Sequence, residues 1–389
     1  MLHSPRIKFM HPNSPTAQEA THQSCRQDIR NPIMTQPIGV AIIGSGLFVK
    51  AEHLPAVLGN AKLDLKALYS RSLKSARETA SQIKDAPRPD LYSDDAPGSN
   101  YADLLRRQDV RAVIVALPIA SQPSYVQAAL AAGKHVLAEK PIAKDVATAQ
   151  ALISFHDSLP GGGGDGGKPI LAVAENFRFV PRLLHAAGQA RALGRVTHFS
   201  VRVAGLVRPD NKYYGTSWRA SPAYQGGFLL DGGVHHAAAT RLFLRGEGDA
   251  PASVRAFTAL TRSHLAPIDT VTAIVRTESG ATGTYFHSAG SLMSAFEWEV
   301  ACERGVVRSD GDVVTVTGED GSKAETRFER TSGVREEVDA WAGSILDGRG
   351  VVVPLQSARE ALADLEFLEN MFASGAEDGE ERRYVLQKW

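Results

Sequence analysis

The chain has 389 residues, of which 43% are hydrophobic and 22% are charged, as in an ordinary globular protein. At about 100–200 residues per domain, this length predicts two or three domains with enough apolar residues to form a core. Lys plus Arg and Asp plus Glu both number 43, and this zero net charge argues against a dedicated nucleic-acid or membrane-surface binder.

Two cysteines, Cys25 and Cys302, are too few for a disulfide framework and are typical of a reducing compartment, so we expect a cytoplasmic protein. No apolar run reaches the roughly 18–20 residues that a membrane span needs. We therefore expect no nucleic-acid or membrane partner.

The first 36 residues combine prolines and polar groups without a helical or alternating pattern, which predicts a disordered tail over 1–36. An organelle-targeting segment is the weaker alternative, because Glu19, Asp28 and the prolines interrupt an amphipathic helix. Met34 is an alternative start of translation directly before the first expected strand.

Apolar strands alternate with helices between residues 37 and 159. Strands are expected at 37–44, 63–69, 111–117 and 135–138, and helices at 47–58, 73–83, 124–132 and 144–159. Strands that are apolar throughout indicate a parallel sheet with helices on both faces. The pattern predicts an α/β fold with a doubly wound Rossmann domain over 37–159.

A glycine-rich turn follows the first strand. Gly44 permits the tight turn, and Gly46 lets backbone N–H groups approach a pyrophosphate at the start of the next helix. Val49 replaces the third glycine of the usual pattern, which implies an adjusted turn. The contacts expected with a dinucleotide come from Gly44, Ser45, Gly46, Leu47 and Phe48.

The end of the second strand indicates which dinucleotide binds. A site for NAD usually has Asp or Glu here to hold the ribose 2′-hydroxyl, and this stretch has none. Ser70, Arg71, Ser72 and Lys74 suit a 2′-phosphate instead, so NADP(H) is expected in preference to NAD(H). The structural alternative is a solvated helix start with Ser72 as its N-cap.

The glycine run before residue 168 is a false phosphate-loop motif. Residues 162–168 fit the spacing G-x-x-x-x-G-K, but a helix precedes them, a strand follows, and Pro169 takes the place of Ser or Thr. The segment 160–168 is therefore expected to be a Gly-rich linker.

Alternating patterns dominate the second half, expected to form a C-terminal domain over 169–389. Strands are expected at 170–179, 195–203, 253–261, 270–277, 282–287, 297–304 and 313–317, and helices at 181–193, 234–244, 334–346 and 357–372. Alternation of apolar and polar residues predicts a sheet with one covered and one open face.

Several motifs together resemble one enzyme family. Residues 132–141 (AGKHVLAEKP), 174–179 (AENFRF), 218–219 (WR) and 226–236 (GGFLLDGGVHH) follow the glycine turn in order. Over roughly residues 38–370, their spacing resembles the glucose–fructose oxidoreductase, inositol dehydrogenase and rhizopine-catabolism family (Gfo/Idh/MocA). The resemblance implies a mixed, mostly antiparallel C-terminal sheet, whose open face would form a homodimer or a higher homo-oligomer.

The sequence also departs from the commoner family pattern. Ile119 follows Pro118 where the family often has Asn, and Gln122 stands where it often has His. One extra residue separates the glycine turn from His53. These features resemble a eukaryotic, fungal-type branch of the family. We expect Leu117, Pro118, Gln122 and Asn176 on the nicotinamide side of the site.

The family transfers hydride between a nicotinamide and a carbon that bears oxygen, so the site needs a proton donor or acceptor. Lys140 follows a parallel strand at its C-terminal end, where such sheets bind ligands. The resemblance assigns catalysis to this lysine and lets Glu139 orient Lys140 or the nicotinamide ribose. It also suggests a cis peptide before Pro141.

Asp231 and His235 are four residues apart, so on a helix they would share a face. The resemblance makes His235 the proton donor or acceptor, and lets Asp231 bind or orient substrate. His236 would point about 100° away and pack, and no metal site is expected. Trp218 and Arg219 suggest a loop over the substrate, with loop packing as the alternative.

The sequence as a whole predicts an NAD(P)-dependent oxidoreductase, with NADP(H) preferred, that acts on a sugar, a polyol or a related carbonyl. The alternative is a non-catalytic NAD(P)-sensing regulator on the same fold. A glycosidase or dehydratase that holds NAD tightly is a third possibility, disfavoured by the basic stretch at Arg71 and Lys74.

Overall fold

The computed structural model describes residues 36–161 and 167–387. The expected tail at 1–36 lies outside the described residues except for Gln36, and so does the middle of the expected linker at 160–168. The remaining predictions all concern described parts of the chain.

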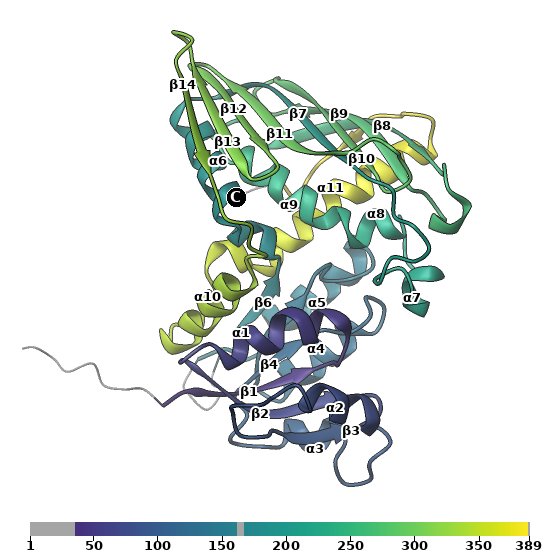
Figure 1. Cartoon of the computed structure of the whole chain (residues 1–389), viewed down its shortest axis with the longest axis vertical. Coiled ribbons are helices and arrows are strands. Elements are labelled where there is room, and N and C mark those ends of the chain that lie inside the picture. The colour runs from purple at the N-terminus through teal and green to yellow at the C-terminus, as the bar shows by residue number, and fades with distance from the viewer. Residues whose placement is uncertain (1–35, 162–166, 388–389) are drawn as a thin grey trace, which may run out of the picture. The chain divides into compact units, whose positions relative to one another are not determined.

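A six-stranded parallel sheet forms the N-terminal part of the described chain (Figure 1). Its strand order is β3-β2-β1-β4-β5-β6, and every neighbouring pair is parallel. This is the order of a Rossmann dinucleotide-binding sheet, so the predicted fold class is confirmed. The strands are β1 (Ile38–Ile43), β2 (Leu63–Ser70), β3 (Asp90–Ser93), β4 (Ala112–Val115), β5 (His135–Glu139) and β6 (Leu171–Ala174).

Helices cover both faces of this sheet. Val40 and Ile42 of β1 belong to one buried cluster and Ala41 and Ile43 to the other, because successive side chains of a strand point to opposite faces. The helices are α1 (Leu54–Leu58), α2 (Leu73–Ala80), α3 (Tyr101–Leu105), α4 (Gln122–Ala131) and α5 (Val146–Ser158). The sequence did not predict β3 and α3, because both are short and β3 is a half-exposed edge strand without an apolar run.

The end of β6 differs from the sequence prediction. We expected one strand over 170–179 inside the C-terminal domain, yet β6 pairs with β5 in the N-terminal sheet and ends at Ala174. The Glu175 carboxylate accepts a hydrogen bond from the backbone N–H of Phe177 at 3.2 Å, and residues Asn176–Phe179 form a 3₁₀ turn, η2. A local bond of this kind competes with strand pairing, so the strand ends before the apolar residues Phe177 and Phe179.

A helix from late in the chain completes the cover of the N-terminal sheet. Helix α10 (Val334–Leu346) contributes Val338 and Trp341 to the same buried cluster as Ile42 of β1. Residues 169–389 therefore do not form a separate domain, because β6 and α10 both pack into the Rossmann part.

The second sheet has nine strands within the described residues, in the order β14-β13-β12-β11-β7-β10-β9-β8-β15. All its neighbouring pairs are antiparallel except β7 with β10, as the mixed, mostly antiparallel prediction required. The strands are β7 (Val196–Ala204), β8 (Pro251–Ala259), β9 (Thr270–Thr277), β10 (Thr282–Ser288), β11 (Ala295–Cys302), β12 (Gly305–Asp310), β13 (Val313–Gly318), β14 (Lys323–Arg327) and β15 (Arg382–Arg383).

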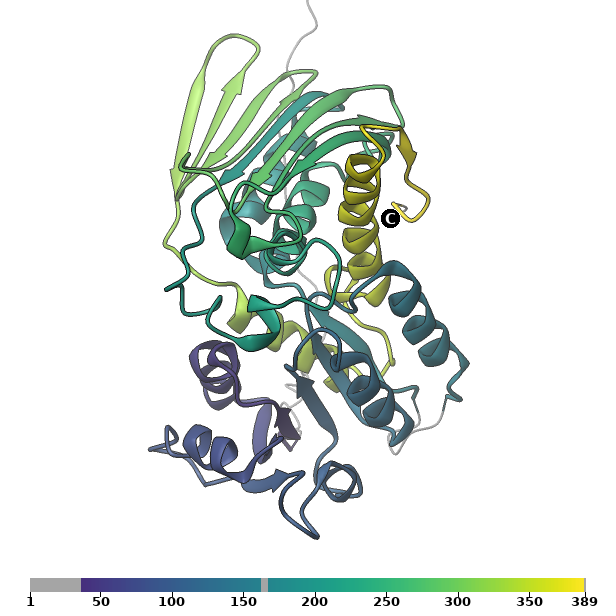
Figure 2. The same ribbon diagram turned by 90° about the vertical axis from the view of Figure 1, so that its right-hand side faces the viewer.

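Within the described residues, helices cover one face of this sheet. Helices α6 (Pro181–Ala192), α9 (Gly233–Phe243) and α11 (Ala358–Ala376) lie on one side, and Figure 2 shows α11, in yellow, running along it. Along β9, buried and exposed residues alternate. On the open face, Phe257 and Ile274 are 62% and 59% exposed.

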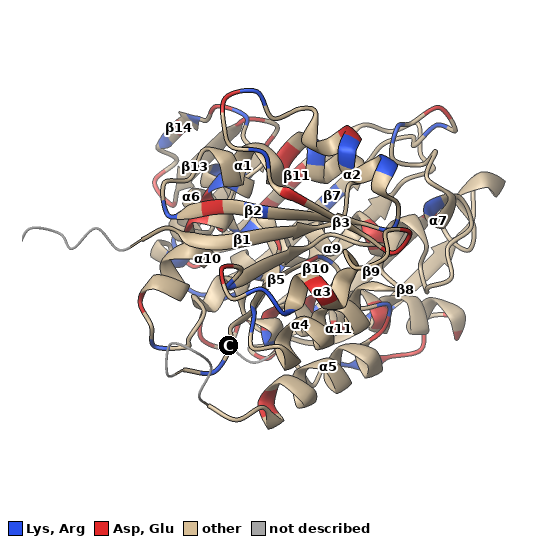
Figure 3. Ribbon diagram, turned by 90° about the horizontal axis from the view of Figure 1, so that it is seen from below, with Lys and Arg blue, Asp and Glu red and all other residues tan. Residues whose placement is uncertain are grey.

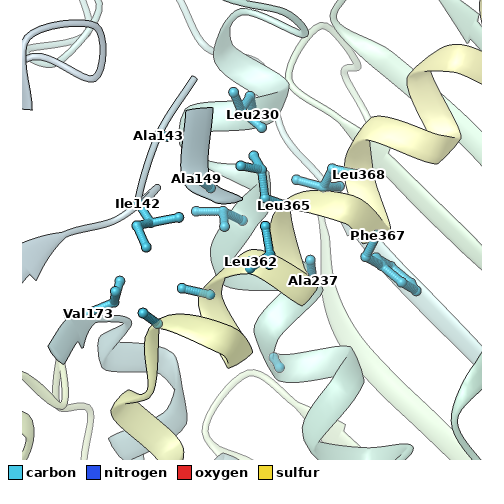
Figure 4. Close-up of a cluster of buried hydrophobic side chains, with 14 of the residues drawn as sticks. Ile142, Ala143, Ala149, Val173, Leu230, Ala237, Leu362, Leu365, Phe367 and Leu368 are labelled. Atoms are coloured by element: carbon cyan, nitrogen blue, oxygen red, sulfur yellow. The ribbon is translucent and has the colours of Figure 1, made fainter. Parts of the chain in front are cut away.

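Helix α11 joins the apolar cores of the two sheets. Figure 4 shows Leu362 and Leu365 of this helix among Ile142 and Val173 from the N-terminal part and Leu230 from the segment before α9. One continuous buried cluster therefore contains residues of both parts, and this fixes the position of one sheet relative to the other.

The charged residues follow no single-sign pattern in the view of Figure 3, where Lys and Arg are interspersed with Asp and Glu over most elements. None of the helices in the described part combines the length and the apolar character that a membrane crossing requires.

Replacement of Trp341 tests the packing of α10 on the Rossmann sheet. Trp341 is fully buried, so Trp341→Ala should lower the free energy of unfolding by about 3–5 kcal/mol, through lost burial and the cavity left behind. Urea unfolding measures the change. Leu292→Ala, at a side chain that is 77% exposed, should change it by less than about 0.5 kcal/mol. Equal effects would contradict the buried position of Trp341.

Candidate active site

A cavity of about 850 Å³ lies at the C-terminal ends of the parallel strands, beneath the short helices α7 (Ser217–Ala220) and α8 (Phe228–Asp231). Open α/β sheets bind their ligands at this edge. Most of the residues predicted from the sequence line it, namely Gly44, Ser45, Gly46, Leu47, Phe48, Ser70, Arg71, Ser72, Leu117, Pro118, Glu139, Lys140, Trp218, Arg219, Asp231 and His235. Three predicted residues, Lys74, Gln122 and Asn176, do not.

The glycine turn has the geometry that a dinucleotide needs. Gly44 has φ +127°, and a Cβ atom there would lie 2.2 Å from the carbonyl oxygen of Ala116. At Gly46 a Cβ atom would meet nothing within 4 Å, so the missing side chain leaves space at the cavity wall. The turn therefore fits a pyrophosphate, which glycine allows the backbone to approach.

The extra residue between the glycine turn and His53 appears as a π-helical turn. Residues Val49–His53 form this turn, η1, directly before α1. A single π turn is the usual way for a helix to absorb one inserted residue. The insertion therefore leaves both the glycine turn and α1 in place.

The adenosine end of the cavity is lined by hydroxyl groups and one guanidinium group. Ser70, Arg71 and Ser72 line it together with Ser75, which the sequence analysis did not single out. Ser72 also caps α2 by accepting the backbone N–H of Ser75 at 3.3 Å, as the structural alternative predicted. Lys74 is exposed and lies outside the cavity wall.

The two carboxyl groups that line the cavity, Glu139 and Asp231, are both at its other end. Asp95 lies near the start of α2, where it accepts the backbone N–H of Leu73 at 2.8 Å, but it does not belong to the wall. Among the described residues, therefore, no carboxylate lines the part of the cavity where a 2′-phosphate would bind.

Gln122 and Asn176 differ from our expectation of direct contact with the nicotinamide. Gln122 is 1% exposed, and its side-chain amide donates to the carbonyl oxygens of Glu139 and of Pro141, the latter at 3.2 Å. It therefore holds the turn that carries Lys140. The amide of Asn176 donates to the carbonyl oxygen of Ser332 at 2.6 Å, because the early end of β6 turns it away from the cavity.

Lys140 and Arg219 converge on the carboxylate of Asp231. Lys140 Nζ lies 2.8 Å from the carbonyl oxygen of Asp231 and 3.2 Å from its Oδ1, while Arg219 Nε donates to Oδ2. The peptide bond between Lys140 and Pro141 is cis. Burial by itself would raise the pKa of Asp231, but the charges of Lys140 and Arg219 outweigh it and lower the pKa to about 2. Asp231 is therefore a carboxylate at any physiological pH.

His235 lies in the first turn of α9 and faces the cavity. Its Nδ1 is 2.6 Å from Oε1 of Glu175, and its ring stacks on Phe177 with centroids 4.6 Å apart. Glu175 lies within the motif AENFRF at 174–179, but the sequence alone did not indicate a role for it. The signal that could have found it is its position directly after a parallel strand, at the edge where ligands bind.

A second carboxylate–imidazole pair lies beside the first. Glu139 Oε1 is 2.6 Å from Nε2 of His53, and Glu139 Oε2 accepts the backbone N–H of Lys140 at 3.1 Å. His53 is fully buried and does not line the cavity. This pair fixes Glu139, and through it the backbone of Lys140.

Aromatic and basic side chains close the substrate end. The guanidinium of Arg219 lies 4.0 Å from the ring centroid of Trp218 and 5.6 Å from that of Tyr213, and all three line the cavity. Gly227, at the N-terminus of α8, has φ +51°, which suits a glycine before the segment that carries Asp231.

Two other residues have structural positions. Arg178 is 2% exposed and pairs with the carboxylate of Asp364. His236 packs edge-on against His287, and burial lowers its pKa well below the ordinary value. Across residues 36–161 and 167–387, no three His, Cys, Asp or Glu side chains gather as metal ligands would.

Comparisons with known proteins agree with this geometry. Residues 38–159 match the model of an oxidoreductase family with an NAD-binding Rossmann fold (Gfo/Idh/MocA), and residues 182–308 match a C-terminal domain of the same family. Between them the two matches include the glycine turn, Lys140, Asp231 and His235.

Three proteins illustrate the relationship. The chain is 40% identical to Dehydrogenase FPY6 of Fusarium mangiferae over 350 residues. This alignment covers 88% of this chain and 97% of that protein. It is 27% identical over 352 residues to D-xylose 1-dehydrogenase (NADP(+)) 2 of Haloferax volcanii, with 83% and 97% covered. A crystal structure of an oxidoreductase from Thermotoga maritima matches with a TM-score of 0.77 and 28% identity, over 90% of this chain and 98% of that one.

The fungal relative agrees with the fungal-type features of the sequence. Its identity and coverage, the two family models and the geometry of the cavity lead to one assignment: the chain is an NAD(P)-binding oxidoreductase of the Gfo/Idh/MocA family.

Proposed function

We propose that this protein is an NADP(H)-dependent oxidoreductase that interconverts a hydroxyl group and a carbonyl group on a sugar, a polyol or a related substrate. One observation carries the proposal. A single cavity runs from the glycine turn and Arg71 to Lys140, Asp231 and His235, so a dinucleotide and a small substrate can share it.

The preference for NADP(H) is supported by the adenosine end of the cavity. Arg71 is exposed and lines the wall beside Ser72 and Ser75, and no carboxylate lines this end. A guanidinium group can bind a phosphate through two parallel hydrogen bonds, whereas a ribose 2′-hydroxyl is usually held by Asp or Glu. The name of the Haloferax relative, an NADP(+) enzyme, supports the same choice.

The residues at the other end suit proton transfer. When bound, the nicotinamide supplies or accepts the hydride. Lys140 has three N–H bonds, two of which are directed at Asp231, so the third is free to polarise a substrate oxygen. His235 lies beside it as the group that takes or returns the hydroxyl proton. Asp231 holds Lys140 in place and stays ionised.

The substrate class is inferred from the wall over these groups. Trp218 and Tyr213 present aromatic faces, which suit the C–H surface of a sugar ring, and Arg219 offers N–H donors to hydroxyl groups. The Haloferax relative is named for a sugar, D-xylose, in agreement with this class.

Lys140, Asp231 and His235 all face one cavity, which favours catalysis over the alternative of a non-catalytic sensor.

We also propose that the protein acts in the cytoplasm as a homodimer formed through the open face of the second sheet. The cellular location rests on the low cysteine content, and the dimer on the exposed apolar residues Phe257 and Ile274 of that face.

The cofactor preference can be tested at Arg71. Arg71→Ala should weaken NADPH binding by about 10–100-fold and leave NADH binding nearly unchanged, because only the 2′-phosphate loses a partner. Fluorescence titration measures both affinities. Lys74→Ala is the matched control, since Lys74 lies outside the cavity wall, and it should bind NADPH as the wild type does. Tighter binding of NADH than of NADPH by the wild type would contradict the preference.

The catalytic assignment can be tested at Lys140 and His235. His235→Ala and Lys140→Ala should each lower kcat by about 10²–10⁴-fold, because each removes a group that acts on the proton or on the developing charge. Oxidation or production of NADPH, followed by absorbance with a panel of sugars, polyols and small carbonyls, measures this. Unchanged turnover in either variant would mean that another residue carries the chemistry.

The proposed dimer can be tested by light scattering. The wild type should have twice the 41.7 kDa mass of one chain, and Ile274→Glu should shift it toward the monomer, because a charge would be buried in the interface. A wild-type mass of 41.7 kDa would reject the proposal.

A further inference from the structure

We propose that Glu175 is a positioning residue that fixes the proton on Nδ1 of His235, so that Nε2 is the atom that exchanges a proton with the substrate. The inference rests on the proposed function for its kinetic consequence, but not for the tautomer itself. Nothing in the known motif assigns a role to this glutamate.

The carboxylate and the imidazole are held in one orientation by their surroundings. Glu175 follows the last residue of β6 and is 1% exposed, and its Oε1 lies 2.6 Å from Nδ1 of His235. The same oxygen accepts the backbone N–H of Phe177 at 3.2 Å, which fixes its position. The ring of Phe177 lies under the imidazole at an angle of 15°. The imidazole is thus fixed by a hydrogen bond at its edge and a ring at its face.

Glu175 is ionised in this environment. Burial raises its pKa, but His235, Arg178 and Lys140 together outweigh burial and lower the pKa below the ordinary value. Arg178 is itself buried and held by Asp364, so its charge stays close to Glu175. A carboxylate without a proton can only accept hydrogen bonds.

An acceptor on Nδ1 determines where the proton of a neutral imidazole sits. Nδ1 must keep its hydrogen to bond to Glu175, so the lone pair of the neutral ring is on Nε2. His235 lines the cavity, and no hydrogen bond to Nε2 occurs among the residues that the structure describes. In the direction of oxidation the substrate O–H bond breaks and its proton binds Nε2. The oxygen keeps the electron pair, which forms the carbonyl bond as hydride leaves the carbon for the nicotinamide.

The charges around His235 are distributed over several elements. Glu175 comes from the end of β6, Arg178 from η2, Lys140 from the turn after β5 and Asp231 from α8, while His236 adjoins it on α9. Lys140 is paired with Asp231, so Glu175 is the carboxylate bonded to His235 itself.

The first test is kinetic. Glu175→Leu removes the acceptor from Nδ1 and should lower kcat/KM by about 10²–10⁴-fold, because the tautomer of His235 is then no longer fixed. Glu175→Asp keeps a carboxylate acceptor and should recover part of the activity. An unchanged kcat/KM in Glu175→Leu would overturn the proposal.

Glu337→Leu is the matched control. Glu337 is fully buried near Glu175, and burial together with nearby carboxylates, Glu139 first, raises its pKa well above the ordinary value. Neither oxygen of its carboxyl group has a hydrogen-bond partner among the described residues, so Glu337→Leu should leave kcat/KM unchanged. A similar loss of kcat/KM in Glu337→Leu would show that any buried substitution lowers it, and would contradict a specific role for Glu175.

The second test does not require turnover. Long-range ¹H–¹⁵N correlation on protein labelled at its histidines reports the tautomer of His235, with His235→Asn identifying its signals. The neutral ring should carry its proton on Nδ1 in the wild type and lose this preference in Glu175→Leu, which has no acceptor for Nδ1–H. A wild-type ring protonated on Nε2 would refute the proposal even if the enzyme is active. A wild type without any NADPH-linked turnover would instead count against the proposed function and leave the tautomer result standing.

Discussion

The buried carboxylate of Asp231 is the constraint on which the rest of the site depends. It accepts hydrogen bonds from Lys140, which follows a strand of the Rossmann sheet, and from Arg219, which belongs to the loop over the cavity. All three side chains are largely shielded from water, so the buried carboxylate is stable because these two cations pair with it. The ion pairs therefore join the substrate-side loop to the cofactor-binding sheet. They also leave Lys140 one N–H for a ligand.

Parallel strands end at one edge of a sheet, and this places two similar carboxylate–imidazole pairs side by side. Glu139 ends β5 and bonds to His53, while Glu175 follows β6 and bonds to His235. The distances are the same, but the two imidazoles differ in exposure to the cavity. His53 is fully buried at the end of η1, and His235 lies in the cavity wall because α9 belongs to the part of the chain with the second sheet. The same local chemistry thus supports the backbone in one place and faces the substrate in the other.

Much of the fold and of the site could be predicted from residue patterns. Continuous apolar strands predicted the parallel sheet, and the glycine turn, Lys140, Asp231 and His235 do line one cavity. The predictions failed where a side chain has a partner far away in the sequence. Gln122 bonds to the turn beyond β5, and Asn176 bonds to Ser332. No local pattern contains these partners. The early end of β6 has a different cause, because Glu175 caps the following turn through a bond to Phe177, only two residues away.

The sequence by itself determined the element types, the cofactor turn and the residues that carry charge to the site, because each depends on nearby residues or on a short motif. Only the tertiary structure decided which charges meet. Asp231 bonds to Lys140, which lies 91 residues earlier in the chain, and His235 bonds to Glu175, which lies 60 residues earlier. Helix α10, late in the chain, packs on the first sheet. These contacts depend on the packing of α11 and α9 between the two sheets, since buried charges are stable only where the surrounding core brings a partner within hydrogen-bond distance.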